Sequence, residues 1–525
     1  IVLTIVHTWP LAAAPGYWSR NNSGDAVLNE WAVAWVGHAL GTRPLRLYDA
    51  NIFHPERRTL AYSEHLVVQG AIVAPVVWLG GSAVLAYNLA MMAGFILTGW
   101  AFCLLVHRWT GFWSAGVIAG SGAAFNSHVL MRLPHLQTQH LEFFALALYA
   151  LDRILVDRRW RSAVLLGAAH ALQGLAGIYV FVFTSWGLAF AALTRVREWL
   201  GRGRLRAFAL VTIGVLFAAA LLAPSLYQYA LVSREMGFTR TMDDARRYAA
   251  TWTDYLLSGS RLHWELWSRR FAGSMAANFP GVTVTVLAVL TLATGIAWRD
   301  RRARMAAGVV IGCALLSMGP SIPGYELLFR IVPLLRAVRV IAHFGQIVLL
   351  GMAILAGFGV AWLAIRYRTR RCWPAVVVLL TVVVNAEALR APFPYTPFEG
   401  IPSIYDFLAR ERHAIVAELP LYPRHMFFGN ANYMLASTRH WHPILNGYSG
   451  FIPPSYQRVY DELKGFPDER SLAALRGLGV SHVVVHRDEF VYFQGAAQYD
   501  AIRQTRDLVP FATSEKIQMY RLKPR

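Results

Sequence analysis

The sequence predicts a mainly α-helical protein, a polytopic membrane bundle of about eleven spans followed by a small C-terminal α/β domain. Of the 525 residues, 56% are hydrophobic and only 15% are charged, whereas soluble domains usually carry about 25% charged residues. Apolar runs of roughly 20 residues, the length that crosses a bilayer core, recur along the chain as far as the linker at Pro392. After this proline-rich linker the composition becomes polar. We therefore expect a transmembrane domain over 1–391 and an extracytoplasmic α/β domain over 392–525.

The membrane segments follow from the lengths of the apolar runs. Residues 1–14 are apolar but too short to span, so we expect the chain to begin inside its first membrane helix, with its true start missing. A first external loop at 15–66 precedes a short run at 66–79, which predicts a re-entrant or interfacial helix. The run at 162–194 is too long for one helix, and Gly174 and Gly177 predict that it breaks into a helical hairpin. Further spans are expected at about 83–107, 113–131, 137–156, 207–230, 281–298, 304–320, 342–365 and 373–390.

The basic residues predict the orientation of these helices. The formal net charge is +20, and much of it lies in four short arginine-rich loops at 158–161, 195–206, 299–304 and 366–371. Such loops remain in the cytoplasm, so the charge is a topology signal and we expect no nucleic-acid partner. The alternating loops and everything after about residue 390 are then expected to face the outside.

The C-terminal region carries local signals for an α/β domain. We expect strands at 414–419, 480–486 and 517–522, and a helix over 468–478 with Asp468 as its cap and Gly479 as its stop. Between the first two strands lies an aromatic segment, 430–456. It either packs the domain onto the membrane part through Trp and Tyr or binds sugar through aromatic faces and amides.

Acidic residues of the first external loop are the candidates for chemistry. Asp25 lies near the start of a predicted helix. Trp31 and Trp35 share one face of this helix, which predicts that it rests on the bilayer surface. Asp25 is either a general base near the headgroups or a first-turn carboxylate that stabilises the helix. Asp49 is either a second carboxylate or a turn residue. Glu64 and His65 either bind a cation or phosphate or cap the next helix. The binding of a divalent cation by Asp25 and Glu64 stays an open alternative. The sequence contains no compact metal-binding spacing and no glycine-rich phosphate loop. Metal ligands and cofactors are therefore unassigned.

Basic residues of two later external segments are candidates for an anion site. Arg132 and His135 lie in one tip, and Arg336, Arg339 and His343 lie in the loop that enters a later helix. Arginine at a membrane surface either holds a phosphate bidentately or extends to lipid headgroups. Both alternatives remain open for these residues.

Together these stretches resemble the GT-C superfamily of integral membrane glycosyltransferases, in particular bacterial YfhO-like and other glycosyltransferase-like membrane proteins. The resemblance rests on Gly24-Asp25 with Asn29-Glu30-Trp31, on 51–55 with 60–66, on Leu136-Gln137, on 339–344 and on 445–450. It implies a protein of the bacterial inner (plasma) membrane that moves a sugar from a polyprenyl-phosphate donor to an envelope glycan, lipid or protein, with inversion, on the external face. By this resemblance Asp25 is the base, and Asp49 or Glu64 assists it. Arg339 and His135 are expected to hold the donor phosphate. The expected substrate site is completed by His65, Arg132, Arg336 and His343. The sequence lacks the paired acids of better-known members at the Asp25 position, so metal dependence is left open.

Two other functions compete with this hypothesis. A transporter or flippase for lipid-linked glycans would carry related repeats and broken helices. No internal repeat is evident, but the break predicted between Gly174 and Gly177 fits this function. A scaffold in envelope assembly would use the C-terminal domain as its working part. Transport without a glycosidic product would favour the first alternative.

Overall fold

The computed structural model describes residues 1–20, 23–237 and 240–524, and the chain divides into two compact units. The helical unit comprises Ile1–Ala13, Ala90–Tyr227 and Gly237–Phe393. The loop–sheet unit comprises Ala14–Leu89, Gln228–Met236 and Pro394–Arg525. The first external loop and the C-terminal region thus belong to the same unit.

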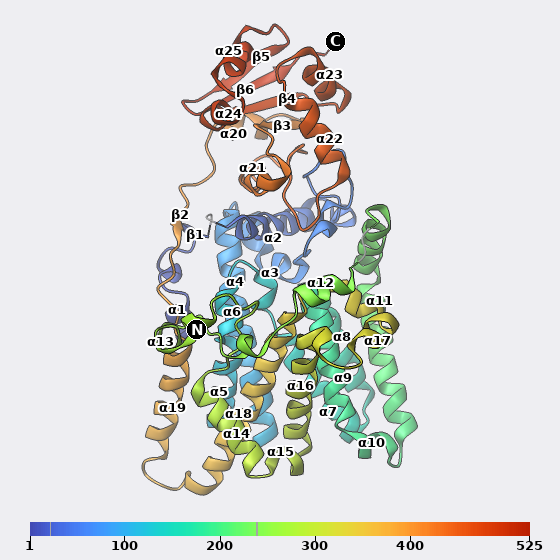
Figure 1. The fold of residues 1–525 in the computed structure, drawn as a ribbon, viewed down its shortest axis with the longest axis vertical. Helices are drawn as coiled ribbons and strands as arrows, with labels where there is room; N and C mark the ends of the chain where they lie inside the picture. Colours follow the sequence, from blue (N-terminus) through green and yellow to red (C-terminus); the bar gives the residue numbers. More distant parts are fainter. Residues whose placement is uncertain (21–22, 238–239, 525) are drawn as a thin grey trace. The chain divides into compact units, whose positions relative to one another are not determined.

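The helical unit is built around one buried helix. Helix α18 (Gly345–Tyr367) packs against α5 (Trp113–Ala124), α14 (Val282–Ala293) and α16 (Arg301–Met318) (Figure 1). Small residues allow this packing, as expected between helices in lipid: a Cβ atom on Gly359 would lie 2.3 Å from a carbonyl oxygen of α14. The buried core of the unit is rich in phenylalanine side chains, among them Phe102, Phe144, Phe183 and Phe344.

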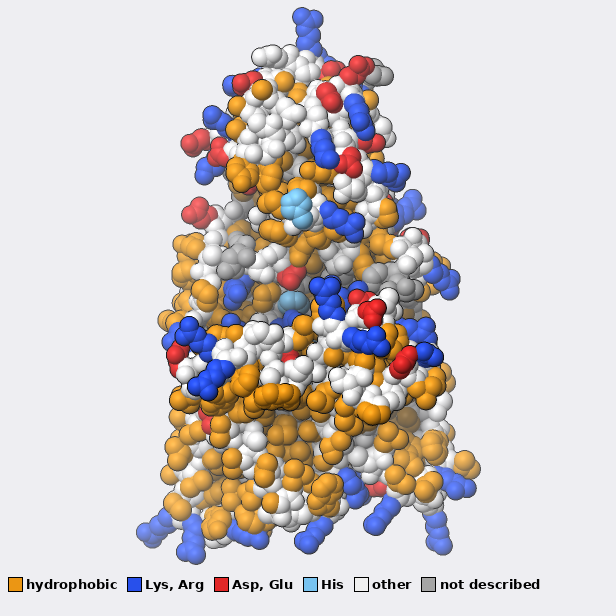
Figure 2. Space-filling view, viewed as in Figure 1, with side chains coloured by type: hydrophobic (Ala, Val, Ile, Leu, Met, Phe, Trp, Pro, Cys, Tyr) orange, Lys and Arg blue, Asp and Glu red, His pale blue; other side chains and the backbone are white. Residues whose placement is uncertain are grey.

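Four helices in the described part of the chain are long and apolar enough to cross a membrane. Their outward faces carry exposed apolar side chains such as Ile213 and Leu216, and Figure 2 shows a largely hydrophobic surface along the helical unit with basic side chains at its lower end. The protein is therefore an integral membrane protein, while the count of about eleven spans stays a prediction. The four are Ala83–Thr110, Arg204–Glu235, Arg301–Ser321 and Ile341–Tyr367, and shorter apolar helices occur at Val67–Trp78, Ile178–Leu193, Val282–Ala293 and Trp373–Ala388.

A buried ion cluster ties several segments of the helical unit together. The Asp152 carboxylate accepts hydrogen bonds from Arg195 Nη1 at 2.7 Å and Arg302 Nε at 2.9 Å. The side chains of Asp152 and Arg195 are fully buried. Asp152 lies on α7 (Glu142–Asp157) and Arg302 on α16, and Arg195 is the N-cap residue of α10 (Val196–Leu200). The cluster therefore fixes these three helices to one another.

The predicted helical hairpin at 162–194 is confirmed. Helix α8 (Trp160–Ala176) ends at Gly177, and α9 (Ile178–Leu193) begins directly after it. The predicted break therefore falls at Gly177 and not at Gly174, which lies within α8.

The loop–sheet unit is centred on helix α2 (Gly24–Thr42). The sequence predicts a helix lying at the bilayer surface, but residues 26–37 of α2 are buried on every side, and α2 packs on α3 (Val67–Trp78) and α21 (Asn430–Ser437). The physical reason is that apolar residues occur all round this helix, a pattern typical of an enclosed helix. The α2 side chain of Trp31 donates from Nε1 to Asn51 Oδ1 at 3.1 Å, which fixes the loop that follows α2.

The C-terminal part of this unit contains a four-stranded sheet. Strands β3 (Val416–Leu419) and β4 (His482–His486) are parallel, β6 (Ile517–Leu522) is antiparallel to β4, and β5 (Leu508–Thr513) is antiparallel to β6. Asp468 caps helix α23 by accepting from the Ser471 backbone N–H at 2.8 Å, as predicted. A further pair of short strands, β1 (Trp18–Ser19) and β2 (Thr396–Pro397), joins the start of this unit to the linker after Pro392.

The remaining helices complete the two units. In the helical unit they are α1 (Val2–His7), α6 (Ser127–Met131), α10 (Val196–Leu200), α12 (Met242–Arg247), α13 (Arg261–Leu266), α15 (Ile296–Arg299), α17 (Tyr325–Ile331) and α19 (Trp373–Ala388). Helices α4 (Ala83–Thr110) and α11 (Arg204–Glu235) contribute residues to both units. The loop–sheet unit adds α20 (Tyr405–Ala409), α22 (Pro454–Leu463), α23 (Glu469–Gly477), α24 (Arg487–Gln494) and α25 (Ala496–Gln504).

Candidate functional site

Asp25 lies in the first turn of α2, in the loop–sheet unit. Ser23 is the N-cap residue, so the Asp25 carboxylate is not the cap. Its Oδ1 atom accepts a hydrogen bond of 2.7 Å from the Tyr448 hydroxyl. Asp25 is thus half-buried and oriented by a residue of the aromatic segment 430–456.

That aromatic segment also packs onto α2 itself. The Trp441 ring stacks on His38 with ring centroids 4.2 Å apart and contacts Trp35 at 6.1 Å. Trp441 therefore packs this segment onto α2 within the loop–sheet unit, while Tyr448 contacts a candidate catalytic group. Packing of the domain onto the membrane part stays a prediction. Sugar contact by this segment stays a prediction.

A second carboxylate of α2, Glu30, was not among the expected site residues. Its side chain is fully buried, and Oε1 accepts a hydrogen bond of 2.7 Å from the Ser19 hydroxyl. Burial raises the pKa of Glu30 to about 8, against the smaller opposing effect of the Ser19 hydrogen bond. The carboxyl is therefore protonated at neutral pH. The signal that pointed to it was an acidic residue within an otherwise apolar helix.

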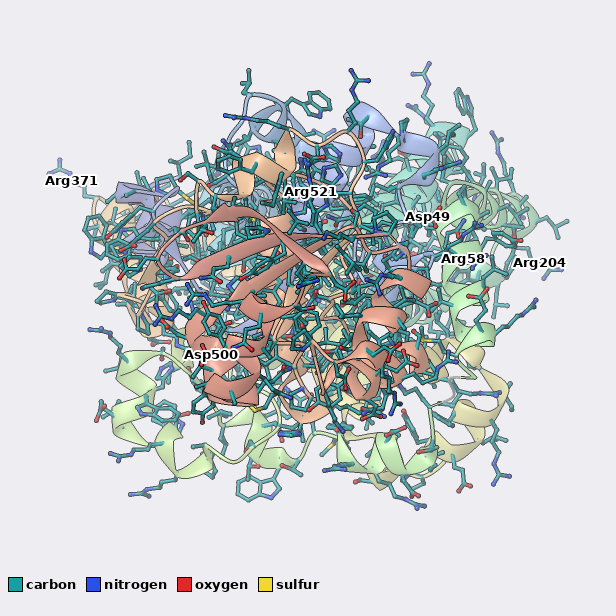
Figure 3. All side chains as sticks on the ribbon, turned by 90° about the horizontal axis from the view of Figure 1, so that it is seen from above. Asp49, Arg58, Arg204, Arg371, Asp500 and Arg521 are labelled. Carbon is teal, nitrogen blue, oxygen red and sulfur yellow. The ribbon has the colours of Figure 1, made fainter. Side chains whose placement is uncertain are left out.

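Asp49 is exposed and lies at a loop closure. It accepts a hydrogen bond of 3.0 Å from the Arg58 backbone N–H, and both residues are labelled in Figure 3. The bond reaches nine positions along the chain and is not the local bond, two residues on, that a turn residue makes. A catalytic role for Asp49 stays a prediction.

Glu64 and His65 precede α3, whose N-cap residue is Leu66. His65 is fully buried, and its Nδ1 atom lies 2.9 Å from the Tyr229 hydroxyl. Tyr229 in turn donates to the Ser63 carbonyl at 2.6 Å. The imidazole is therefore held within the unit by a hydroxyl from α11, and Glu64 is half-buried beside it.

The helical unit contains a cluster of basic side chains around His343. The Arg132 guanidinium is hydrogen-bonded to His343 Nε2, and the His128 ring packs edge-on against His343 with centroids 5.0 Å apart. His128 Nδ1 lies 3.1 Å from Asn278 Oδ1. Burial, with Arg132 next in effect, lowers the pKa of His128 to about 3, so this imidazole is neutral. His135 and Arg339 are close enough to act electrostatically on His343.

Arg339 lies at the exposed side of this cluster. Its backbone N–H donates to the Tyr179 hydroxyl at 3.1 Å, and its guanidinium lies over the Tyr248 ring, 5.5 Å from the centroid. The Arg240 side chain is also hydrogen-bonded to Tyr179, and the positive charge of Arg339 contributes to lowering its pKa, after burial. We call Arg132, His135, Arg240, Arg339 and His343 the cationic cluster. Sequence reasoning missed Arg240 and His128, because neither lies next to the expected residues in the chain.

Arg336 is placed differently from the other expected ligands. Its guanidinium donates to the carbonyls of Phe329 at 3.1 Å and Arg330 at 2.6 Å, near the end of α17. These bonds satisfy carbonyls that a helix leaves unpaired. Substrate binding by Arg336 stays a prediction.

A metal ligand set does not appear in the described part of the chain. No group of three His, Cys, Asp or Glu side chains gathers there with the geometry to hold a metal ion.

The comparisons with known proteins rest on structure. The sequence matches no protein-family model and has no significant match among curated proteins. Two structures of the arabinofuranosyltransferase AftD from Mycobacteria, the second of a mutant, align with 100% of this chain at TM-scores of 0.57 and 0.59 and 16% identity. The chain spans 39% and 41% of the length of those two proteins. ArnT from Cupriavidus metallidurans, solved with undecaprenyl phosphate bound, aligns at a TM-score of 0.51 and 14% identity over 100% of this chain and 98% of its own.

Identities this low establish a common fold and nothing about activity. The alignments extend over the whole chain, so both units take part in the likeness. The resemblance expected from the sequence is confirmed at the level of the fold: the chain shares the fold of AftD and ArnT.

Proposed function

We propose that this protein is an inverting glycosyltransferase that moves a sugar from a polyprenyl-phosphate donor to an acceptor hydroxyl on the extracytoplasmic face of a bacterial inner membrane. The cationic cluster carries the proposal. The fold is shared with a protein that was solved with undecaprenyl phosphate bound. In this chain two arginines, Arg132 and Arg339, both act electrostatically on His343, and Arg132 is hydrogen-bonded to it. Guanidinium groups bind phosphate oxygens bidentately.

In the proposed reaction the acceptor oxygen attacks the anomeric carbon of the donor. The bond between that carbon and the phosphate oxygen breaks, and polyprenyl phosphate leaves with the electron pair. Asp25 takes the proton from the acceptor hydroxyl. Positive charge at the cationic cluster stabilises the departing phosphate, whose negative charge increases as the bond breaks.

The hydrogen bond from Tyr448 supports Asp25 as the base. A general base contributes only when it is held at a fixed position, and the 2.7 Å contact orients this carboxylate. Asp25 and the cationic cluster belong to different units, so separate substitutions test the two parts of the proposal. The acceptor class, an envelope glycan, lipid or protein, stays open, as does a divalent cation.

The test uses the full chain in membranes supplied with undecaprenyl-phosphate-linked pentoses and hexoses, with radiolabel on the sugar. Transfer of label to an acceptor and release of undecaprenyl phosphate are both measured. We expect Asp25→Asn to reduce transfer by about 100-fold or more, the usual contribution of a general base. Asp500→Asn, which removes an exposed carboxyl of α25 (Figure 3), is the matched control and should transfer at the original rate.

Two outcomes would overturn the proposal. Transfer at the original rate by Asp25→Asn would eliminate the base. Movement of intact donor across the membrane with no glycosidic product from any sugar would identify a transporter instead.

A further inference from the structure

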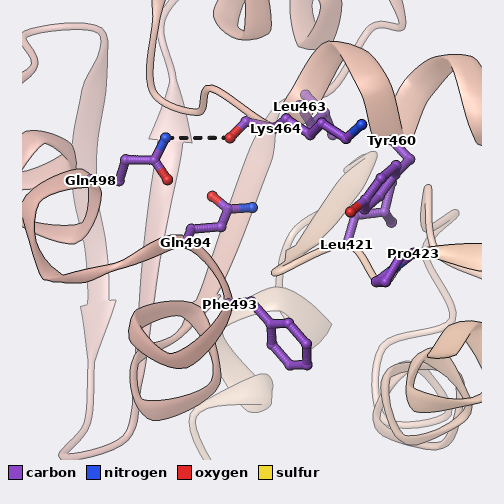
Figure 4. Close-up of a pocket in the computed structure, with 8 residues that line it drawn as sticks. All are labelled: Leu421, Pro423, Tyr460, Leu463, Lys464, Phe493, Gln494 and Gln498. Atoms are coloured by element: carbon purple, nitrogen blue, oxygen red, sulfur yellow. Dashed lines mark hydrogen bonds between the residues drawn. The ribbon is translucent and has the colours of Figure 1, made fainter.

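A pocket of about 230 Å³ lies in the C-terminal part of the loop–sheet unit, apart from the residues named above. Two of its lining residues, Leu421 and Pro423, follow β3, and two others, Phe493 and Gln494, end the helix that follows β4. Strands β3 and β4 are parallel, and open sheets with parallel strands bind ligands beyond their carboxyl ends. The pocket is at that edge of the sheet. Its lining is Leu421, Pro423, Tyr460, Leu463, Lys464, Phe493, Gln494 and Gln498 (Figure 4).

Hydrogen bonds connect the three segments that form the walls. The buried Tyr456 hydroxyl of α22 donates to the Tyr422 carbonyl at 2.6 Å. The Tyr422 hydroxyl donates to Glu489 Oε2 of α24 at 3.1 Å. Gln498 Nε2 of α25 donates to the Lys464 carbonyl, which ends α22, at 3.3 Å. The walls are therefore fixed before any ligand binds, which lowers the entropic cost of binding.

An unsatisfied acceptor lines this pocket. The Oε1 atom of Gln494 is buried and has no hydrogen-bond partner within the described residues. Figure 4 shows the Gln494 amide with its nitrogen towards Leu421 and Tyr460 and its oxygen towards the side of Lys464. Buried polar atoms are nearly always paired in folded proteins, so this acceptor is available for a hydrogen bond from a ligand hydroxyl.

The charges of the lining exclude most classes of ligand. Lys464 is the one charged side chain among the eight, and its ammonium group is already paired with Asp461 at 2.7 Å. It also lies 5.0 Å from the centroid of the Tyr460 ring. A lining with one neutralised cation and no carboxylate favours neither an anion nor a cation.

The remaining chemistry fits a neutral ring with hydroxyl groups on its rim. The rings of Tyr460 and Phe493 offer apolar surface, and the amides of Gln494 and Gln498 offer donors and acceptors for hydroxyls. The volume is below the roughly 300–1,000 Å³ of sites for drug-sized ligands. We propose that this pocket binds a single neutral sugar residue of a glycan. The proposal concerns binding only and does not rest on the proposed transfer reaction.

Saturation-transfer NMR on the full chain in detergent tests the proposal, with the methyl glycosides of glucose, galactose, mannose and arabinose as probes. We expect at least one of them to bind the native protein. Gln494→Leu and Phe493→Ala should each weaken its binding by about ten-fold or more. The matched controls are Gln504→Leu, an exposed glutamine of α25, and Tyr492→Ala, an exposed aromatic next to Phe493; both should bind as the native chain does.

Thermal unfolding of each variant verifies that it is folded, and Tyr460→Ala replaces any lining variant that is not. The proposal is overturned if none of the four glycosides binds the native chain, or if the lining variants bind as tightly as the controls. Asp25→Asn separates this proposal from the transfer proposal, because it should lose transfer and keep sugar binding.

Discussion

Replacement of Glu30 by glutamine should make the protein more stable at alkaline pH. Glu30 is fully buried in α2, with Ser19 as its hydrogen-bond donor, and burial raises its pKa to about 8. In the unfolded chain the same carboxyl has an ordinary pKa, near 4.5. Glutamine has the shape of the protonated acid and keeps an acceptor for the Ser19 hydroxyl, but it does not ionise.

The sign of the effect follows from proton binding. Between pH 4.5 and pH 8 the folded state keeps the Glu30 proton and the unfolded state loses it, so the free energy of unfolding falls as the pH rises. The decrease in the free energy of unfolding is complete above the pKa that Glu30 has in the folded state. At about 1.4 kcal/mol for each pKa unit, the difference between 4.5 and 8 corresponds to a loss on the order of 5 kcal/mol. Glu30→Gln removes this loss and leaves the stability at pH 4.5 nearly unchanged.

The assay is thermal unfolding of the full chain in detergent, followed by tryptophan fluorescence at a series of pH values from 4.5 to 9. The quantity of interest is the difference in apparent Tm between Glu30→Gln and the native chain, because other titrating groups cancel in it. We expect this difference to grow by several degrees up to about pH 8 and then to level off. Asp500→Asn removes an exposed carboxyl and should show a flat difference. A flat difference for Glu30→Gln as well would refute the reasoning, since it would mean that Glu30 ionises alike in both states.

Three further substitutions test other parts of the structure. Tyr448→Phe should lower kcat for transfer by about five- to ten-fold and leave KM unchanged, because it removes the hydroxyl that orients Asp25; an equal loss in a binding assay for the donor would contradict this. Arg132→Gln should raise the KM for the donor by about 10- to 100-fold, the value of a charged hydrogen bond, whereas Arg330→Gln, an exposed arginine of α17, should not. Asp152→Asn should destabilise the protein by about 1.5–3 kcal/mol, because Arg302 loses its carboxylate partner and Arg195 keeps only its ion pair with Glu198; an unchanged apparent Tm in the same unfolding assay would show that the ion cluster is dispensable.

Local signals in the sequence predicted local structure well. Asp468 and Gly479 bound α23 as expected, and the hairpin breaks at one of the two glycines named for it. Strand β5 was missed, since its Pro510 interrupts the pattern of a strand. Its pairing with β6 has a bulge next to this proline.

Environments set by distant residues could not be predicted in the same way. Tyr448 is 423 positions from Asp25 in the chain, and no local pattern links the two. The pKa of Glu30 depends on its enclosure within the folded unit, which the sequence of α2 indicates only through its apolar residues. Arg240 joins the cationic cluster through Tyr179, a residue of a helix far from it in the chain. The residue types were visible in the sequence, but their contacts were not.

The surroundings of three acids in the first external loop favour one of them as the base. A general base at neutral pH must be ionised and must be reached by the acceptor hydroxyl. Glu30 is fully buried and holds its proton to about pH 8, so it meets neither condition. Asp49 is exposed to solvent, and its carboxylate accepts a hydrogen bond from the Arg58 backbone N–H. Among the described residues, no side-chain hydroxyl orients it in the way that Tyr448 orients Asp25. Asp25 is half-buried and oriented by a tyrosine hydroxyl, the surroundings that suit a base. If this distinction holds, Asp25→Asn loses transfer with little change in apparent Tm, and Glu30→Gln gains apparent Tm at pH 8 with little change in transfer.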